Sequence, residues 1–405
     1  MKVIYFSTAL SDEIFSKITE KCKTFKPTFS GVGFDRNVAK GISEFVDLEA
    51  VSLYPIPSWP KYKKIKQRAH FFKIGKTDFF VPALLDVPIV KEKSFCRSTI
   101  KYIKEKNRIG EKFDAILISG LYRTFLRPAR ILKKKLGIPL YAIVPDLPEL
   151  MITYRKDYSF LRRVINRIDA KVAQKYRSSV DGFVFLSSFM NKAINDKNKP
   201  FVVVDGLCDI DVSLPNEISK REKYILYAGK ISKKFGVDIL VEGFKSANLE
   251  GMKLYLCGDG DYAEQLRVIS TQDDRVVFFG LLPHDKIIEM ERKASLLVDP
   301  RYTDSDIVKM SFPSKIIEYM ASGTPVLTTN MPCFGEEYKK YQYRIDEESV
   351  SGVAEALNKV FSVSESERIE LGSNARKFIL NNKTLSKQCK TIMELINKGR
   401  IYEDR

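Results

Sequence analysis

The amino-acid sequence predicts an α/β fold with parallel sheets in two domains. Short apolar segments alternate with helical segments along the chain, which is typical of parallel sheets covered by helices. The alternation stops at residues 205–219 and restarts after Lys223. A length of 405 residues suits two domains, each with its own core. We therefore expect an N-terminal domain at 1–205, a second domain at 206–384, and a C-terminal helix at 385–405 that packs back on the first domain.

The elements follow from runs of apolar and β-branched residues and from apolar residues at helical spacing. In the first half we expect strands at 3–6, 51–54, 115–119, 139–144, 181–186 and 201–204, and helices at about 36–45, up to 135, and 158–176. In the second half we expect strands at 224–228, 253–257, 275–279 and 296–300, and helices at about 237–247, up to 293, and 385–398.

Charge and composition narrow the class of partner. The net charge of +17, from 68 Lys and Arg against 51 Asp and Glu, indicates an anionic membrane, a phosphorylated substrate or a nucleic acid. The basic residues are dispersed and form no nucleic-acid-binding motif, so we expect no nucleic-acid partner. Six scattered cysteines and two histidines argue against a Cys/His zinc site and suit free thiols in a reducing cytosol.

The sequence predicts no membrane span, because no apolar run approaches the ~18 residues that a span needs. The first residues look like a strand, not a signal peptide. Residues 59–76 combine aromatic and basic side chains, which suits either an anionic membrane surface or a solvated basic loop. We expect a cytoplasmic protein that is soluble or peripheral on the inner face of the membrane.

Two places in the first half are candidates for ligand contacts. Residues 29–33 predict a flexible loop in which Gly31 and Gly33 admit a ligand, or a plain connection to the next helix. Asp146 follows the strand at 139–144, at the end of a parallel strand where open α/β sheets bind ligands. The alternative for Asp146 is a capping residue in a turn.

Residues 311–329 predict a loop, a short helix and a buried strand. Pro313 suits the first helical turn, Gly323 suits the left-handed residue after the helix, and Pro325 lies just beyond it. One face is apolar and consists of Ile316, Ile317, Met320 and Ala321, whereas the polar face carries Lys315, Glu318 and Ser322.

The chemistry of this helix allows two interpretations. Its N-terminus offers free N–H groups and a positive dipole to an anion. Lys315 adds a cation and Glu318 adds an acceptor for hydroxyl groups, so together they could hold a ribose diphosphate. The alternative is an amphipathic helix with a surface Lys–Glu pair. Four loops of the second half, at 229–236, 258–261, 280–284 and 299–314, should meet at the same sheet edge, which favours a nucleotide-sized crevice.

In these motifs the second half resembles the donor-binding domain of GT-B fold glycosyltransferases of family 4, in the form found in polysaccharide assembly. Residues 227–240 resemble the family's diphosphate loop, and Cys257-Gly-Asp-Gly resembles its second glycine loop. Residues 279–283 resemble the segment that holds the base, and residues 312–327 resemble the carboxylate-bearing helix. Residues 144–149 and 181–187 of the first half resemble these enzymes more loosely.

The resemblance implies two Rossmann-like domains with parallel sheets facing a cleft. It implies a retaining transfer of a sugar from a nucleotide-diphosphate donor, a UDP-sugar, to a lipid-linked or polysaccharide acceptor in surface glycan synthesis. It implies no cofactor and no metal ion, although Asp259/Asp261 and Asp304/Asp306 have a metal-binding pattern. The alternative function is a non-catalytic partner subunit that supports another transferase.

Carried over residue by residue, the resemblance assigns roles and also shows departures. It implies donor binding by Gly229, Gly258, Leu281, Ser311, Ser314, Lys315 and Glu318, catalytic roles for Asp146, Lys230 and Lys234, and an acceptor loop at Gly31 and Gly33. Lys230 stands at the position of the family's arginine, and Phe235 at that of its lysine. Met310 stands at the position of the first glutamate, for which Asp304 and Asp306 are candidate substitutes.

Overall fold

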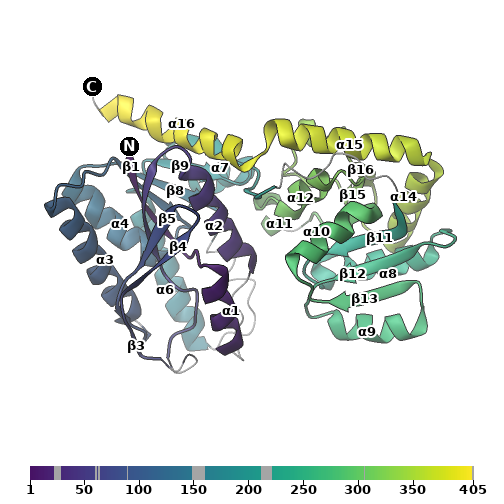
Figure 1. Ribbon diagram of the computed structural model, residues 1–405, viewed down its shortest axis with the longest axis horizontal. Coiled ribbons are helices and arrows are strands. Elements are labelled where there is room, and N and C mark those ends of the chain that lie inside the picture. The colour runs from purple at the N-terminus through teal and green to yellow at the C-terminus, as the bar shows by residue number, and fades with distance from the viewer. Residues whose placement is uncertain are drawn as a thin grey trace. The chain divides into compact units, whose positions relative to one another are not determined.

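The computed structural model describes residues 1–21, 29–59, 62, 64–88, 90–147, 160–210, 221–304 and 306–403 (Figure 1). It confirms the predicted α/β class with parallel sheets, because an eight-stranded and a six-stranded sheet form in separate parts of the chain. Two compact units result: unit 1 comprises residues 1–207 and 385–405, and unit 2 comprises residues 208–384.

The main sheet of unit 1 has the order β10-β9-β8-β7-β1-β2-β5-β4, and its strands are parallel except for β4, which runs antiparallel to β5. Val3 in β1 lies opposite Leu48 in β2 and Ala115 in β7. A separate antiparallel pair joins β3 to β6. The strands are β1 Lys2–Ser7, β2 Asp47–Ser52, β3 Lys66–Gln67, β4 His70–Ile74, β5 Thr77–Val81, β6 Leu84–Leu85, β7 Ala115–Ser119, β8 Leu140–Val144, β9 Gly182–Phe185 and β10 Phe201–Val203.

Helices cover both faces of this sheet because alternate strand residues are apolar on each side. Tyr5 and Leu117 share a core with residues of α2 and α16, whereas Phe6 stacks on Phe125 of α4 on the other side. The C-terminal helix α16 packs against α2, β9 and β10. The helices of unit 1 are α1 Asp12–Lys21, α2 Phe29–Ile42, α3 Val90–Arg108, α4 Arg123–Leu136, α6 Phe160–Arg177, α7 Ser188–Ile194 and α16 Leu385–Glu403.

Two expectations for unit 1 are wrong. Gly31 and Gly33 lie inside α2 instead of in a flexible loop, because the helix already begins at Phe29 and places the buried Val32 and Val38 on its inner face. The basic stretch 59–76 is not one loop, since β3 and β4 form within it. Among the described residues no helix is long and apolar enough to cross a membrane.

Unit 2 has one parallel sheet with the order β13-β12-β11-β14-β15-β16. Leu226 in β11 lies opposite Tyr255 in β12 and Leu297 in β14. Apolar residues of β11, β12, β14, α8 and α14 form its largest core. The strands are β11 Glu222–Ala228, β12 Lys253–Cys257, β13 Val276–Gly280, β14 Ala294–Asp299, β15 Val326–Thr329 and β16 Tyr343–Ile345. The helices are η1 Lys233–Phe235, α8 Val237–Ser246, α9 Ala263–Gln272, α10 His284–Lys293, α11 Asp306–Met310, α12 Ser314–Ser322, α13 Glu336–Lys339, α14 Val350–Ser362 and α15 Glu365–Asn382.

Candidate functional site

The strand order of unit 2 makes the carboxyl ends of β11 and β14 a switch point, the place at which an open α/β sheet has its crevice. After β11 the chain builds β12 and β13 on one side of it, and then returns to build β14, β15 and β16 on the other side. The loops that leave β11 and β14 therefore diverge. In open α/β sheets this switch point is the usual ligand site.

Glycine loops form one side of this crevice and are joined through their backbones. The Gly229 N–H donates to the carbonyl of Cys257 at 2.9 Å, and the Gly258 N–H donates to the carbonyl of Gly280 at 2.7 Å. Gly258 has a φ of +136°, and a Cβ atom there would lie 1.8 Å from the Gly229 carbonyl oxygen. No side chain fits between these loops, so a ligand at this edge would meet backbone instead of side chains.

Helix α12 forms the other side of the crevice. The apolar face predicted for it is confirmed, since Ile316, Ile317 and Met320 are buried. Gly323 has the predicted left-handed conformation, with a φ of 80°. Pro313 precedes the helix as its N-cap residue instead of lying in the first turn, and no described side chain caps this end. The Ile316 N–H donates to the Pro313 carbonyl at 2.9 Å, so the N–H groups of Ser314 and Lys315 and the positive end of the helix dipole are left for an anion.

The polar face of α12 is smaller than the sequence predicts. Ser322 is buried, because its hydroxyl donates to the Tyr319 carbonyl at 2.7 Å and accepts from the Thr324 N–H at 3.1 Å. Tyr319 is also fully buried, and its hydroxyl accepts from the Ala228 N–H at 2.8 Å and donates to the Ala228 carbonyl at 3.1 Å. This pair of hydrogen bonds attaches α12 to the end of β11.

Lys315 lies over the point at which β11 and β14 separate. Its Nζ is 2.9 Å from Oδ1 of Asp299, the last residue of β14, and 4.0 Å from the centre of the Tyr227 ring. Burial lowers the pKa of Lys315 to about 8, although Asp299 acts in the opposite direction. The ammonium nitrogen is buried beside Asp299 and the Tyr227 ring, so Lys315 can act on an anionic ligand through its charge.

A second cation stands beside the first. The Arg301 guanidinium lies 3.5 Å from the Asp299 carboxylate and 4.9 Å from the centre of the Phe235 ring. Phe235 occupies the position at which the resemblance expects a lysine, and the structure brings an arginine against it. The sheet edge thus carries a cation at this place from a different part of the sequence.

Two carboxyl groups meet behind the exposed end of α12. Glu318 is half-buried, and its Oε1 lies 3.9 Å from Nδ1 of His284. Glu291 of α10 is buried and shares a hydrogen bond with Glu318. Burial raises the pKa of both carboxyl groups, most strongly that of Glu291. We assign the shared proton to Glu291, which leaves the more exposed Glu318 as the acceptor.

The remaining donor-site candidates lie around the same edge. Lys230 is exposed, and its carbonyl accepts a hydrogen bond from the Tyr227 hydroxyl at 2.8 Å. Lys234 is exposed on the short turn η1. Ser311 is half-buried and Ser314 exposed at the start of α12, and Leu281 is 66% exposed after Gly280.

Sequence reasoning missed four residues of this site, namely Glu291, Asp299, Arg301 and Tyr319. Asp299 had a usable signal, because it ends an apolar strand in the same way as Asp146 follows one. Glu291 had none, since one glutamate in a charged helix looks like any solvated residue. Met310 is half-buried at the end of α11. Within the described part of the chain, no cluster of three or more His, Cys, Asp and Glu side chains could hold a metal ion.

Two carboxylates of unit 1 lie near the carboxyl ends of its strands. Asp146 is half-buried two residues after β8, and burial raises its pKa. Asp35 of α2 was missed: its carboxylate accepts from the Thr8 N–H and hydroxyl, both at 2.7 Å, and from the Ser119 hydroxyl. Asp35 therefore links the carboxyl ends of β1 and β7.

Comparison with known proteins agrees with the observed fold. Residues 213–378 match the family described as Glycosyl transferases group 1. A search of curated proteins finds no matching sequence. The fold of the chain is similar to that of sucrose-phosphate synthase from Thermosynechococcus elongatus, with a TM-score of 0.66, 13% identity and coverage of 100% of both chains.

Two further structures have the same fold. The lipopolysaccharide outer core galactosyltransferase WaaB in its apo form has a TM-score of 0.62 and 13% identity, with coverage of 98% of this chain and 99% of that one. Alr3699/HepE from Anabaena, solved in complex with UDP, has a TM-score of 0.62 and 14% identity, with coverage of 98% and 100%. These likenesses show the GT-B fold.

Proposed function

Because this chain is a group 1 glycosyltransferase of the GT-B fold, as residues 213–378 and the architecture show, we propose that it transfers a sugar from a UDP-sugar to a lipid-linked or polysaccharide acceptor. The observation that carries the proposal is the arrangement of Lys315, the uncapped start of α12 and the glycine loops around one crevice. Unit 2 binds the donor, and unit 1 binds the acceptor.

The donor diphosphate is held by backbone N–H groups and by cations. The first turn of α12, with Ser311 and Ser314 beside it, supplies N–H groups and dipole to one phosphate. Lys315 neutralises charge from the crevice floor, and the exposed Lys230 and Lys234 do so from the loop after β11. A metal ion is not required in this scheme because phosphate charge is met by protein cations.

The nucleoside is held on either side of the diphosphate. Glu318 accepts hydrogen bonds from the ribose hydroxyls, while the proton on Glu291 keeps the two neighbouring carboxyl groups from repelling each other. The exposed Leu281 and the backbone around Gly280 contact the base. UDP is also the nucleotide in the complex of Alr3699/HepE.

The chemical step is departure of the diphosphate from the anomeric carbon of the sugar. The C–O bond to phosphate breaks with its electron pair on the phosphate oxygen, and the acceptor hydroxyl forms the new bond and loses its proton. Lys230, Lys234 and Lys315 stabilise the charge that develops on the leaving group. Asp146 orients the acceptor hydroxyl. Retention of the anomeric configuration is part of this proposal, because the resemblance to family 4 enzymes implies it.

The acceptor class is proposed from charge and from one structural neighbour. A net charge of +17 suits an acceptor that is anionic or attached to an anionic membrane at its cytoplasmic face. WaaB, which has the same fold, is a galactosyltransferase of the lipopolysaccharide outer core. Co-sedimentation with anionic liposomes at low salt tests the membrane part, which absence of binding would contradict.

The second candidate function is a non-catalytic subunit that supports another transferase. Met310 favours it, because this side chain supplies no carboxylate at the position of the first glutamate. The two functions differ in one measurement. Hydrolysis or transfer of a donor by the purified chain alone would exclude the non-catalytic one.

The test is a panel of UDP-, GDP- and ADP-sugars with the purified chain, read out as nucleotide release. We expect UDP release. Glu318→Ala should weaken UDP binding by about 10- to 100-fold, since hydrogen bonds to charged groups contribute about 1.5–3 kcal/mol. Glu289→Ala is the matched control, because Glu289 pairs with Lys286 and Lys293 on the exposed face of α10. Full UDP affinity in the Glu318→Ala variant would refute the site.

A further inference from the structure

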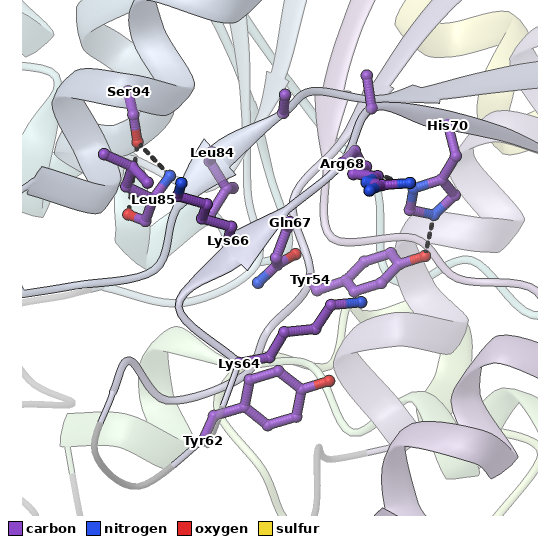
Figure 2. A pocket seen from close by; sticks show the side chains of 12 residues that line it. Tyr54, Tyr62, Lys64, Lys66, Gln67, Arg68, His70, Leu84, Leu85 and Ser94 are labelled. Carbon is purple, nitrogen blue, oxygen red and sulfur yellow. Dashed lines mark hydrogen bonds between the residues drawn. The ribbon is translucent and has the colours of Figure 1, made fainter.

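Unit 1 contains a large pocket that the proposed donor site does not use (Figure 2). Its volume is about 880 Å³, within the range of small-molecule sites. Its walls come from Tyr54, Tyr62, Lys64, residues 66–70, residues 83–85 and Ser94. We call it the hairpin pocket, because it lies at the open end of the hairpin formed by β4 and β5.

The hairpin pocket lies at the carboxyl edge of the sheet. Tyr54 follows the end of β2, and Ala83 follows the end of β5, which runs parallel to β2. His70, the first residue of the antiparallel β4, lies opposite Val81, the last residue of β5. All three chain segments therefore reach the pocket at the edge at which open α/β sheets bind their ligands.

One wall is rigid and aromatic. The Tyr54 hydroxyl and Nε2 of His70 are 2.6 Å apart, and the two rings meet edge to face with centres 5.7 Å apart (Figure 2). Nδ1 of His70 lies 3.1 Å from the Arg68 carbonyl, which can only accept. His70 therefore carries its proton on Nδ1 and accepts from Tyr54 on Nε2. Both side chains are held in place before any ligand arrives.

Three cations line the pocket, and no described carboxylate pairs with them. Lys64, Lys66 and Arg68 are exposed, and none of them forms an ion pair with a described residue. The nearby carboxylate of Asp86 does not serve them. It is fully buried, lies 2.9 Å from the Lys91 ammonium and accepts from the Gln67 amide at 2.8 Å. The pocket is therefore positively charged, and the hydrogen bond to Asp86 fixes the Gln67 side chain.

The floor is apolar and is positioned by a short sheet. Lys66 and Gln67 of β3 pair with Leu85 and Leu84 of β6. Leu84 is buried, whereas Leu85 is 40% exposed. A pocket with cations, an aromatic wall and an apolar floor suits a ligand that carries a negative group on a ring with apolar faces.

We propose that the hairpin pocket binds an anionic saccharide, that is, a sugar bearing a phosphate or a carboxylate, as part of the acceptor. Arg68 and Lys66 hold the anionic group, and Tyr54, His70 and Leu85 contact the ring. This proposal rests on the proposed transferase function, because it names the chemistry of the acceptor. It makes unit 1 selective for acidic acceptors.

The experiment measures binding of glucose 1-phosphate, glucuronic acid and glucose to the full chain by calorimetry or NMR at low salt. We expect both anionic sugars to bind at least tenfold more tightly than glucose. The double variant Lys66→Ala/Arg68→Ala should lose this preference. The control variant Lys73→Ala/Lys76→Ala removes the same charge from the far part of the hairpin, outside the pocket, and should keep the preference.

The readouts separate this proposal from the donor site. UDP binding should be the same in all three proteins, because the pocket lies in unit 1. If the wild-type chain fails to bind UDP, the proposed function is wrong; if it binds UDP but shows no preference for anionic sugars, only the pocket assignment is wrong. Equal loss of preference in both double variants would overturn it, since net charge alone would then explain binding. Loss of liposome binding with unchanged sugar binding would also overturn it, because the cations would then serve a membrane surface.

Discussion

The ammonium of Lys315 lies 2.9 Å from the carboxylate of Asp299, at the point at which β11 and β14 separate. Asp299 is fully buried, whereas the Lys315 side chain is 18% exposed. The pair holds a cation at the floor of the crevice, where its charge is unfavourable because of burial and partly compensated by the carboxylate. A bound diphosphate would complete the compensation.

UDP affinity should depend on pH through Lys315, whose pKa burial lowers to about 8. The ammonium is charged below that pH and neutral above it, and only the charged form attracts a diphosphate. Affinity should therefore be level below pH 8 and fall by up to about tenfold for each pH unit above it. Lys315→Arg, which stays charged, should flatten the profile. Calorimetry from pH 7 to 9.5 tests this, and equal slopes for the two proteins would contradict it.

Asp299→Asn should destabilise unit 2 by about 3 kcal/mol, because it leaves the buried Lys315 and Arg301 without their shared carboxylate. The free energy of unfolding in urea measures this loss. Glu264→Gln is the control: its ion pair with Arg267 is exposed, so the loss should stay below about 1 kcal/mol. Similar losses in the two variants would show that the buried Asp299 contributes no more to stability than an exposed ion pair does.

Tyr319→Phe should weaken UDP binding without any contact to the ligand. Removal of the hydroxyl breaks both hydrogen bonds to Ala228 and leaves its buried N–H and carbonyl unpaired, at a cost of about 1–3 kcal/mol. The attachment of α12 to β11 then loosens. Tyr224→Phe loses one hydrogen bond to the Met290 carbonyl on α10 and should lower stability while UDP affinity is retained. Unchanged UDP affinity in the Tyr319→Phe variant would show that the hydrogen bonds between Tyr319 and Ala228 do not support UDP binding.

Gly258→Ala should disrupt the glycine loops. The added methyl group would lie 1.8 Å from the Gly229 carbonyl oxygen, so one of the two loops must move. Gly251→Ala is a strict control, because Gly251 also has a positive φ and meets only the flexible end of Lys223, at 4.0 Å. Both variants carry backbone strain of about 1–2 kcal/mol, but only Gly258→Ala should also lose UDP binding. Thermal unfolding scans measure the loss of stability in each variant, and a separate UDP titration of the folded variant measures the loss of binding.

Glu291→Gln should change how stability depends on pH. Burial raises the folded-state pKa of Glu291, so its favourable contribution is complete below the unfolded pKa of about 4.5 and is lost as the pH rises through the folded value. The amide never ionises and can still donate to Glu318. The variant should therefore gain stability relative to the wild type as the pH rises above about 4.5, by at most about 1.4 kcal/mol per pH unit. A constant difference from pH 4.5 to 8 would show that Glu291 is not the proton carrier.

The strands of both units could be predicted because parallel strands buried on both faces are continuous apolar runs. The strand at 115–119 and that at 253–257 match the observed bounds. The helix after Pro313 was recognisable from its apolar spacing and from Gly323. Ser322 was assigned to the polar face and Tyr319 was missed, because a polar side chain can be buried when the backbone supplies its hydrogen-bond partners.

Local sequence signals also failed where tertiary packing overrides them. Gly31 and Gly33 suggest a loop, but packing of Val32 and Val38 extends the helix through them. The run of cations at 59–76 looks uniform in the sequence, yet the pairing of β3 with β6 turns Lys66 and Arg68 toward a pocket. Neither result follows from the composition of those segments.

By itself, the sequence determined the α/β class, the restart of the alternation after Lys223, and the helix that bears Lys315 and Glu318. These features depend on the periodicity of apolar residues and on residues that are close in the sequence. Only the tertiary structure decided that Asp299, Arg301 and Glu291 belong to the same site, and that Asp86 is withdrawn from the hairpin pocket. Such groups meet because strands from distant parts of the chain end at one sheet edge. Burial at that edge shifts the pKa values of Lys315 and Glu291, and the spacing of residues in the sequence does not show this burial.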